Sequence, residues 1–366
     1  MKTFLGRVGI IQRVLPQYRA PFFDKLAGRC EGGLSVFAGE ARSSEAIKTA
    51  ENLQVAQHFP AENHHYLSGA FYLCKQAGMQ EWLETWQPEA LIVEANPRYL
   101  SSRKAVRWMK AQARPVIAWG LGSGRGGGLL AVLSHPLRRN FLNDFDAVIA
   151  YSQEGLDSFA ALGLDDLKLF HAANAVVDAP QQEPDAIDVQ GKPRVLFVGR
   201  LQARKGLERL IGASQSVQST WPHELRIVGD GPEMERLQNL ATRYFNESIH
   251  FTGALYGAEL EQEFRQAELF VLPGTGGLAI QQAMGFGLPI IAGEGDGTQR
   301  DLLDSSNGWQ LNTDEEYELT RVLWGALSNR ESLHSKGLAS YQKVKERFNL
   351  DAMTDVFVQA LNEVSG

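Results

Sequence analysis

Short apolar runs alternate with segments of helical periodicity along almost the whole chain, and this alternation limits the fold more than any other feature of the sequence. Such runs fit buried parallel strands, and strand–helix–strand repetition is the pattern of parallel α/β folds. We expect strands at "RVGIIQ", "LSVFAG", "ALIVEA", "PVIAWG" and "AVIAYS" in the first half, and at "RVLFVG", "LRIVGD", "IHFTGA", "LFVLPG" and "PIIAGE" in the second.

One segment interrupts the alternation. Residues 174–193, "NAVVDAPQQEPDAIDVQGKP", are rich in Pro, Gln and Asp and are typical of an interdomain linker. A second α/β series follows, and 366 residues exceed one ordinary core. We therefore expect an α/β protein of two doubly wound, Rossmann-like domains, 1–177 and 178–366, facing each other across a cleft. The last helix, at about 349–364, is expected to pack back on the first domain.

Composition excludes several classes of protein. The net charge is −7, with +2 in residues 1–178 and −9 in the rest, so nucleic acid is not the natural partner. No apolar run is long enough for a transmembrane helix, and the N-terminus reads as a first strand because Arg7 and Arg13 interrupt it. Two cysteines and eight histidines show neither a disulfide framework nor metal-ligand spacing. We expect a cytoplasmic protein without a metal ion.

The stretch "LFVGRLQARKGLERLI", residues 196–211, places cations in the turn after a buried strand. A strand-to-helix turn exposes backbone N–H groups, and the helix adds positive potential at its start. Gly199 permits a close backbone approach, Arg200 can bind two oxygens, and Lys205 acts as a point charge. The turn predicts a diphosphate site, with a solvated basic turn as the alternative.

Two further strand ends are candidates for the same site. In "VGDGPE", Asp230 and Gly231 either line a nucleotide pocket or only cap a helix. In "LPGTGGLAIQQAMGFG", a glycine-rich turn opens a helix whose bare amides favour an anion. A tight corner is the alternative there. The candidate residues of this turn and helix are Gly274, Thr275, Gly276, Gly277, Leu278 and Gln282.

The order "GRLQARKG", "VGDGPE", "FTGALYGAEL" and "VLPGTGGLAIQQAMGFGLPII" resembles the family 4 nucleotide-sugar glycosyltransferases, which are retaining enzymes of the GT-B fold. The match covers nearly all of 194–310, and "LPQYRAPFFDKLA" extends it loosely into the first half. The resemblance implies transfer of a hexose or deoxyhexose from a nucleoside-diphosphate sugar to a hydroxyl of a glycan or lipid-linked precursor. Arg200 and Lys205 would hold the diphosphate and stabilise the leaving group, without a cofactor.

The chain departs from the family pattern at three positions. The usual Glu-x7-Glu residues correspond to Gly274 and Gln282, and a His near the reaction centre corresponds to Leu121. Gln282 can still bind a ribose, and the backbone amides of residues 276–278 can replace the first Glu. A catalytically degenerate GT-B protein that acts as a binding or scaffold partner remains the alternative, and a GT-B epimerase or phosphorylase a weaker one. Replacing Gly274 by Glu is expected to separate enzyme from scaffold.

Topology alone suggests the acceptor side. The strand-end loops of the first half contain Arg19, Glu94, Asn96, Trp119 and Arg125. The stretch "WGLGSGRGGG" resembles a dinucleotide fingerprint, but it lies too late in the fold and has too many glycines. Residues 101–114, "SSRKAVRWMKAQAR", have five basic and no acidic residues. They either contact an anionic membrane, at the inner face, or form a solvated face over a buried stripe.

Overall fold

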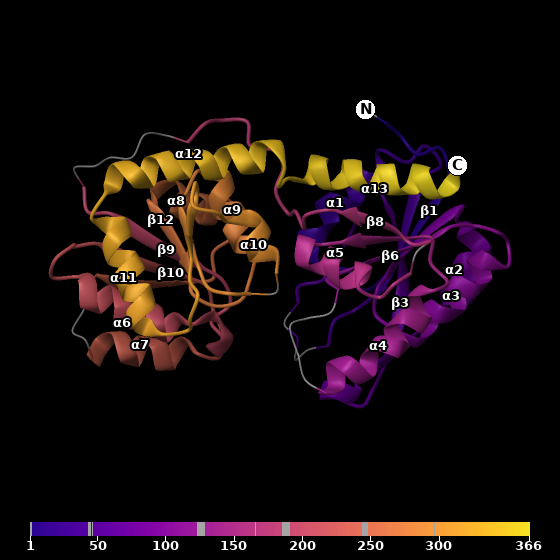
Figure 1. The fold of residues 1–366 in the computed structure, drawn as a ribbon, viewed down its shortest axis with the longest axis horizontal. Coiled ribbons are helices and arrows are strands. Elements are labelled where there is room, and N and C mark those ends of the chain that lie inside the picture. Colours follow the sequence, from indigo (N-terminus) through magenta and orange to yellow (C-terminus); the bar gives the residue numbers. More distant parts are fainter. Residues whose placement is uncertain are drawn as a thin grey trace. The chain divides into compact units, whose positions relative to one another are not determined.

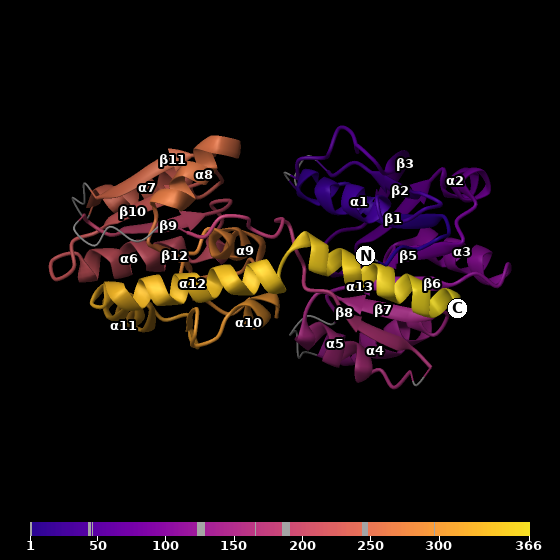
Figure 2. The same cartoon turned by 90° about the horizontal axis from the view of Figure 1, so that it is seen from above.

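The computed structural model describes residues 2–366 apart from 43, 44, 46, 123–128, 165, 185–190, 244–247 and 296. The chain divides into two compact units. Unit 1 contains Met1–Val176 together with Leu350–Gly366, and unit 2 contains Val177–Asn349. Each unit has its own sheet with helices on both faces (Figure 1, Figure 2).

Among its described residues, unit 1 forms an eight-stranded sheet in the order β4-β3-β2-β1-β5-β6-β7-β8. The strands pair in parallel except for the antiparallel pair of β3 and β4. The elements are β1 Val8–Val14, α1 Ala20–Ala27, β2 Leu34–Gly39, β3 Gln57–Tyr66, β4 Leu73–Ala77, α2 Met79–Trp86, β5 Ala90–Glu94, α3 Leu100–Lys110, β6 Val116–Gly120, α4 Leu129–Leu142, β7 Ala147–Ala150, α5 Gln153–Ala160, β8 Lys168–His171 and α13 Leu350–Ser365, with short 3-10 turns η1 Gln17–Arg19 and η3 Gly69–Phe71.

Both faces of the unit 1 sheet are buried, because successive strand residues point to opposite faces. Ile10 belongs to the core beneath α1 and α13, whereas Ile11 belongs to the core beneath α2 and α3. The last helix is part of the first of these cores. Phe357 on α13 is fully buried, and its ring lies 4.9 Å from that of Phe22 and 5.0 Å from that of Trp119.

Unit 2 forms, in its described part, a six-stranded sheet in the order β11-β10-β9-β12-β13-β14, with parallel pairs throughout. The elements are β9 Arg194–Val198, the 3-10 turn η4 Ala203–Lys205, α6 Leu207–Val217, β10 Glu224–Val228, α7 Met234–Arg243, β11 Ile249–Gly253, α8 Gly257–Gln266, β12 Leu269–Leu272, α9 Leu278–Gly285, β13 Ile290–Ala292, α10 Thr298–Leu302, β14 Gly308–Gln310, α11 Glu316–Leu327 and α12 Arg330–Glu346.

The doubly wound α/β fold expected from the sequence is confirmed, and every strand expected there is present. The sequence analysis missed β3, β4, β8 and β14. Three of these strands close an edge of a sheet, and β3, which precedes β4, carries only half-buried or exposed side chains. Their residues therefore lack the continuous apolar run that marks an inner parallel strand.

Each sheet contains a topological switch point, where the strand order reverses. In unit 1, β1 lies between β2 and β5, and in unit 2, β9 lies between β10 and β12. Ligands of doubly wound sheets bind outside the carboxyl ends of the strands at such points. The loops after β1 and β5 in unit 1, and those after β9 and β12 in unit 2, are therefore the places to search for binding groups.

Candidate functional site

The basic turn after β9 bends at two glycines with positive φ. Gly199 has a φ of 155°, and Gly206, with a φ of 69°, is the N-cap of α6. Between them, Arg200 is exposed and Lys205 is half-buried. The turn therefore presents two cations beside the start of a helix, as the diphosphate prediction requires.

Backbone hydrogen bonds hold the loop after β10 against this turn. Gly199 N–H donates to Val228 O at 3.0 Å, and Leu201 N–H donates to Asp230 O at 2.9 Å. The exposed Asp230 carboxylate accepts from the N–H of Gly231 at 2.7 Å, so one of its oxygens stabilises its own turn. Asp230 and Gly231 thus lie directly beside the basic turn.

The glycine-rich loop after β12 contacts the same turn across the switch point. Lys205 Nζ donates to the carbonyl oxygen of Thr275 at 2.6 Å, and the Arg204 guanidinium donates to Thr275 Oγ1 at 2.7 Å. In return, Thr275 N–H donates to the carbonyl oxygen of Arg204 at 3.2 Å. The two loops therefore form one surface, in which cationic side chains of the basic turn contact the backbone of the glycine-rich loop.

Gly274 has no room for a side chain. A Cβ atom at this position would lie 2.6 Å from the carbonyl carbon of Lys205 and 2.7 Å from its Cα, with the carbonyl oxygen of Arg204 nearer still. At Gly276, a Cβ atom would run into the Lys205 ammonium group. A Glu at 274 would force the two loops apart, so the substitution expected from the sequence to separate enzyme from scaffold is the wrong test.

Two residues that the sequence analysis missed support this loop. Gln299 is fully buried and donates from Nε2 to Gly274 O at 3.0 Å. Arg209 donates to Pro273 O at 3.0 Å and pairs with Asp314 at 2.8 Å. Arg209 lies in the first turns of α6, right after the basic turn, and this place in the sequence is a signal that could have identified it. Nothing in the sequence around Gln299 marks its role.

The start of α9 leaves backbone amides available. Gly277 is its N-cap, no side chain caps the helix, and its first turn contains no acidic residue. Gly277 and Leu278 are half-buried, one turn before Gln282. This end of α9 has the free N–H groups and the positive potential that favour an anion.

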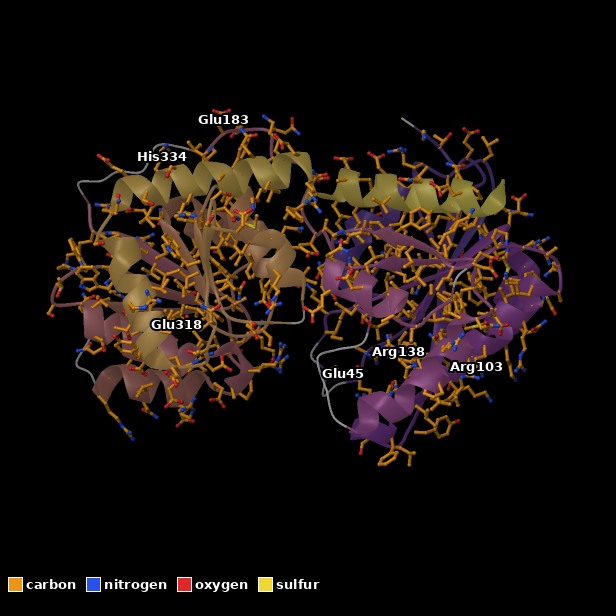
Figure 3. All side chains as sticks on the ribbon, viewed as in Figure 1. Glu45, Arg103, Arg138, Glu183, Glu318 and His334 are labelled. Carbon is orange, nitrogen blue, oxygen red and sulfur yellow. The ribbon has the colours of Figure 1, made fainter. Side chains whose placement is uncertain are left out.

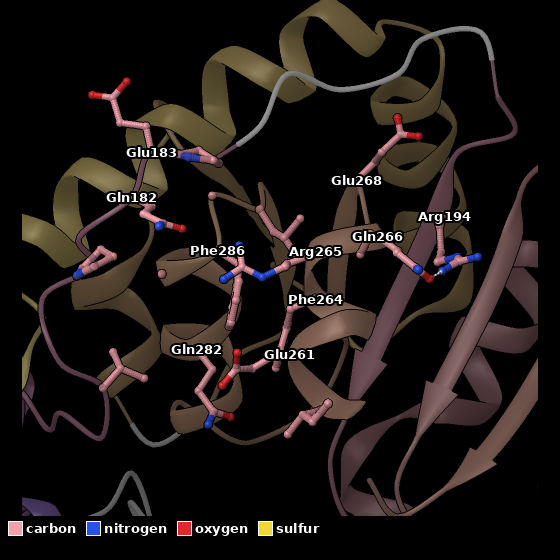
Figure 4. Close-up of a pocket in the computed structure, with 18 of the residues that line it drawn as sticks. Gln182, Glu183, Arg194, Glu261, Phe264, Arg265, Gln266, Glu268, Gln282 and Phe286 are labelled. Atoms are coloured by element: carbon pink, nitrogen blue, oxygen red, sulfur yellow. Dashed lines mark hydrogen bonds between the residues drawn. The ribbon is translucent and has the colours of Figure 1, made fainter. Parts of the chain in front are cut away.

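Gln282 lines a hollow of about 1050 Å³ whose lining includes neither Arg200 nor Lys205. Glu261 and Arg265 of α8 lie on its wall with Gln282 (Figure 4). The Phe264 and Phe286 rings stack there with 5.1 Å between their centroids.

In unit 1, the predicted acceptor-side residues gather at the carboxyl edge of the sheet. Arg19, which follows β1, is 6% exposed, and its guanidinium carbon lies 5.2 Å from the centre of the Trp119 ring. Trp119 is 1% exposed and so belongs to the core. Glu94 ends β5 and accepts the N–H of Arg13 at 2.8 Å. Burial raises the pKa of the Glu94 carboxyl to about 7, against the opposing charges of Arg13 and Arg19.

Other residues of this edge have different roles. Asn96 accepts the N–H of Arg98 at 3.1 Å and so stabilises the turn before α3. Leu121, which stands where relatives place a His, is 41% exposed. Arg125 lies outside the described residues. Sequence reasoning missed Tyr99 and Tyr151, whose phenol pKa values are raised by burial.

The apolar side chains of the basic helix α3 are buried in unit 1. Val106 and Met109 are 2% and 0% exposed, whereas Lys104 and Arg107 point to solvent. Arg103 on α3 and Arg138 on α4 (Figure 3) lie over aromatic rings, with their guanidinium carbons 5.6 Å from the centre of the Phe141 ring and 5.7 Å from that of Phe159. The helix thus has a solvated basic face over a buried stripe.

Neither a membrane span nor a metal cluster is found in the part of the chain that the structure describes. No helix there has both the length and the apolar character to cross a bilayer. Over the same described ranges, no three His, Cys, Asp or Glu residues gather as metal ligands would.

Sequence comparisons support the interpretation of unit 2. Residues 192–329 match the family model described as glycosyl transferases group 1. A GDP-mannose-dependent phosphatidylinositol monomannoside mannosyltransferase of Mycolicibacterium smegmatis is 28% identical over 63% of this chain and 65% of its own length. A GDP-mannose-dependent α-mannosyltransferase of Corynebacterium glutamicum is 33% identical over 50% of this chain and 44% of its own. The chain spans between about a third and two thirds of the curated relatives it matches.

Solved structures match the fold over nearly the full length. Sucrose-phosphate synthase of Thermosynechococcus elongatus has a TM-score of 0.73 at 16% identity, covering 98% of each chain. The Anabaena protein HepE, in complex with UDP, has a TM-score of 0.72 at 17% identity, covering 99% of this chain and 100% of its own. Unit 2 thus has the sequence pattern of the group 1 glycosyl transferases over residues 192–329, and the whole chain has the fold of solved GT-B glycosyltransferases.

Proposed function

We propose that the protein transfers a hexose or deoxyhexose from a nucleoside-diphosphate sugar to a hydroxyl group of an acceptor, with retention of configuration. One observation carries the proposal. The basic turn after β9 and the glycine-rich loop after β12 meet at the switch point of unit 2, where Lys205 Nζ lies 2.6 Å from Thr275 O. Cations and free helix amides at one switch point suit a diphosphate.

Arg200 and Lys205 bind the donor diphosphate in this proposal. The amides of residues 276–278 contact phosphate and sugar, Gln282 contacts the ribose, and Asp230 with Gly231 lies near the base. In a retaining transfer, the diphosphate leaves as the acceptor hydroxyl approaches the same face, and a leaving-group oxygen takes the acceptor proton. The protein then mainly positions the substrates and stabilises the negative charge that develops on the diphosphate. No metal ion is required, because the two cations supply the positive charge.

GDP-mannose is the first donor to test, since several relatives are described as GDP-mannose-dependent. UDP-sugars come second, because the similar HepE structures contain UDP or UDP-glucose. Unit 1 binds the acceptor, a glycan or a lipid-linked precursor, through its own switch point. A lipid-linked acceptor would place the protein in the cytoplasm at the inner face of the membrane, with the basic face of α3 toward anionic headgroups.

Calorimetric titration with GDP, UDP, ADP and dTDP tests the donor site. We expect one nucleotide to bind, and Lys205→Ala to weaken its binding at least tenfold. Arg321→Ala is the matched control, because Arg321 is an exposed cation of unit 2 on α11, outside the loops of the site. Absence of binding by all four nucleotides, or equal binding by the two variants, would overturn the assignment. NMR of the product then gives the anomeric configuration.

A non-catalytic binding or scaffold protein is the second candidate. It is favoured by the residues at 274 and 282, where Gly274 and Gln282 stand in place of the two carboxylates that the family pattern has. The two candidates differ in turnover. An enzyme transfers or slowly hydrolyses the bound sugar nucleotide, whereas a scaffold binds the nucleotide and leaves the donor intact over hours.

A further inference from the structure

A guanidinium group lies buried at the carboxyl edge of the unit 1 sheet and forms no ion pair among the described residues. Arg19 is 6% exposed, its Nη1 has no hydrogen-bond partner, and it forms no ion pair with any described residue. Its neighbours are three aromatic rings, those of Tyr18, Trp119 and Tyr151, at 5.6, 5.2 and 5.5 Å. Ring faces attract a cation, but they do not accept the hydrogen bonds of its planar fork.

A second unsatisfied donor lies beside the first. Trp119 Nε1 is also buried without a partner, and the indole N–H can only donate. A buried donor without a partner is satisfied by a group that brings lone pairs, and the positive charge of Arg19 favours a group that is also negative. A buried donor without a partner costs free energy, so a ligand that supplies the missing acceptor gains what the free protein lacks.

The carboxylates of this edge are engaged elsewhere. Glu45 pairs with Arg13 at 2.9 Å and with Arg42 at 2.9 Å, and these contacts lower its pKa to about 2. Glu94 accepts the backbone N–H of Arg13 and is the carboxylate whose charge acts on Arg19. Since burial raises the pKa of Glu94 to about 7, its negative charge is incomplete at neutral pH. Neither of these two carboxylates therefore forms an ion pair with Arg19.

Arg19 joins the 3-10 turn η1 to α1. Its own N–H donates to Pro16 O, and the N–H of Ala20 donates to Gln17 O, so the first amides of α1 are already bonded. Tyr18, which precedes Arg19, is 48% exposed and provides an aromatic surface at the same edge. The edge thus combines a buried guanidinium and an exposed ring, a combination that suits an acidic sugar.

We propose that unit 1 recognises an acceptor carrying an anionic group, a carboxylate or a phosphate, which binds the guanidinium of Arg19 at the carboxyl end of β1. The name "acceptor" rests on the proposed function, but the binding of the anion does not require the donor. Arg19 positions the acceptor by its charge, and the ring of Tyr18 covers the sugar to which the charge is attached.

Three probes with a similar ring test the proposal on the full chain. Glucuronate carries a carboxylate, glucose 1-phosphate carries a phosphate, and methyl glucoside is neutral. By calorimetry at low ionic strength, we expect at least one anionic probe to bind at least tenfold more tightly than methyl glucoside. The comparison of the two anions identifies the acceptor as a uronic acid or a sugar phosphate. Equal binding of all three probes would refute the proposal.

Variants locate the binding. Arg19→Gln is expected to weaken anion binding at least tenfold, and Arg107→Gln, an exposed cation of the same unit, is expected to leave it unchanged. If Arg19→Gln does not fold, Arg19→Lys keeps the positive charge but lacks the planar guanidinium group. This variant is expected to bind the anion less tightly than the native protein. Lys205→Ala tests the donor loops of unit 2 separately, through nucleotide binding. Anion binding that is unchanged in Arg19→Gln contradicts the proposal. If the native protein binds the anion but no nucleotide, only the donor assignment is contradicted.

Discussion

Gly274→Ala tests whether the loop requires a glycine at this position or has simply lost the Glu that the family pattern has there. The added Cβ atom would lie 2.6 Å from Lys205 C and 2.7 Å from Lys205 Cα, well inside van der Waals contact, and the neighbours there are backbone atoms that cannot rotate away. Overpacking of this kind costs about 1–3 kcal/mol. For a unit of this size, such a loss lowers the melting temperature by roughly 2–12 °C. The shift also separates Lys205 from Thr275, so nucleotide affinity should fall with stability.

Differential scanning calorimetry of the full chain, followed by nucleotide titration, measures both effects. Gly325→Ala is the matched control: Gly325 lies within α11, no atom lies within 4 Å of its added Cβ, and its φ is not positive. There, alanine is expected to raise stability by about 1 kcal/mol through its helix propensity. A Gly274→Ala protein that melts at the native temperature and binds nucleotide normally would show that the packing drawn between the two loops is wrong.

Four other changes test separate parts of the structure. Arg200→Ala removes an exposed cation of the basic turn, and roughly tenfold weaker nucleotide binding is expected by calorimetry. Treatment with EDTA should leave this binding unchanged, since cationic side chains take the place of a metal ion. Phe357→Ala empties a fully buried position of unit 1, and should lower the unfolding free energy of that unit by about 3–5 kcal/mol without moving the transition of unit 2. The pKa of Glu94 is about 7 in the folded protein and 4.5 for a solvated Glu. The free energy of unfolding therefore falls as pH rises through this window, by at most about 1.4 kcal/mol per pH unit. Glu94→Gln should flatten that slope in urea titrations at pH 5, 6, 7 and 8, and an unchanged slope would exclude Glu94 as its source.

The fold was largely readable from the sequence because inner parallel strands are buried on both faces. Runs such as "ALIVEA" and "RVLFVG" have no polar alternation, and they became β5 and β9. The strand pair β3–β4 was not readable, since only Phe59 and Ala61 of "QHFPAENHHY" pack on the core and the rest of β3 depends on pairing with β2 and β4. Pairing partners distant along the chain leave no local pattern in the sequence.

Part of the candidate site could also be predicted from local sequence patterns. Glycine and cation spacing after a strand marks a local turn, and Gly199, Arg200 and Lys205 do lie in one. The contacts between turns were not readable: Arg204 with Thr275, and Gln299 with Gly274, join residues more than twenty positions apart. In unit 1, the sequence did not predict that Trp119 is buried beneath Arg19. The position of Trp119 at a strand end suggested an exposed side chain.

The atoms packed around Gly274 explain why this position is a glycine. A position that tolerates a Glu needs space for its Cβ atom, and backbone atoms cannot rotate away to provide that space. Here the space is filled: the backbone of Arg204 and Lys205 occupies it, Thr275 donates to Arg204 O, and Gln299 donates to Gly274 O. A carboxylate at 274 and the contact between Lys205 and Thr275 therefore exclude each other. This packing supports the proposal that the loop binds the donor through cations and backbone amides, without the usual Glu.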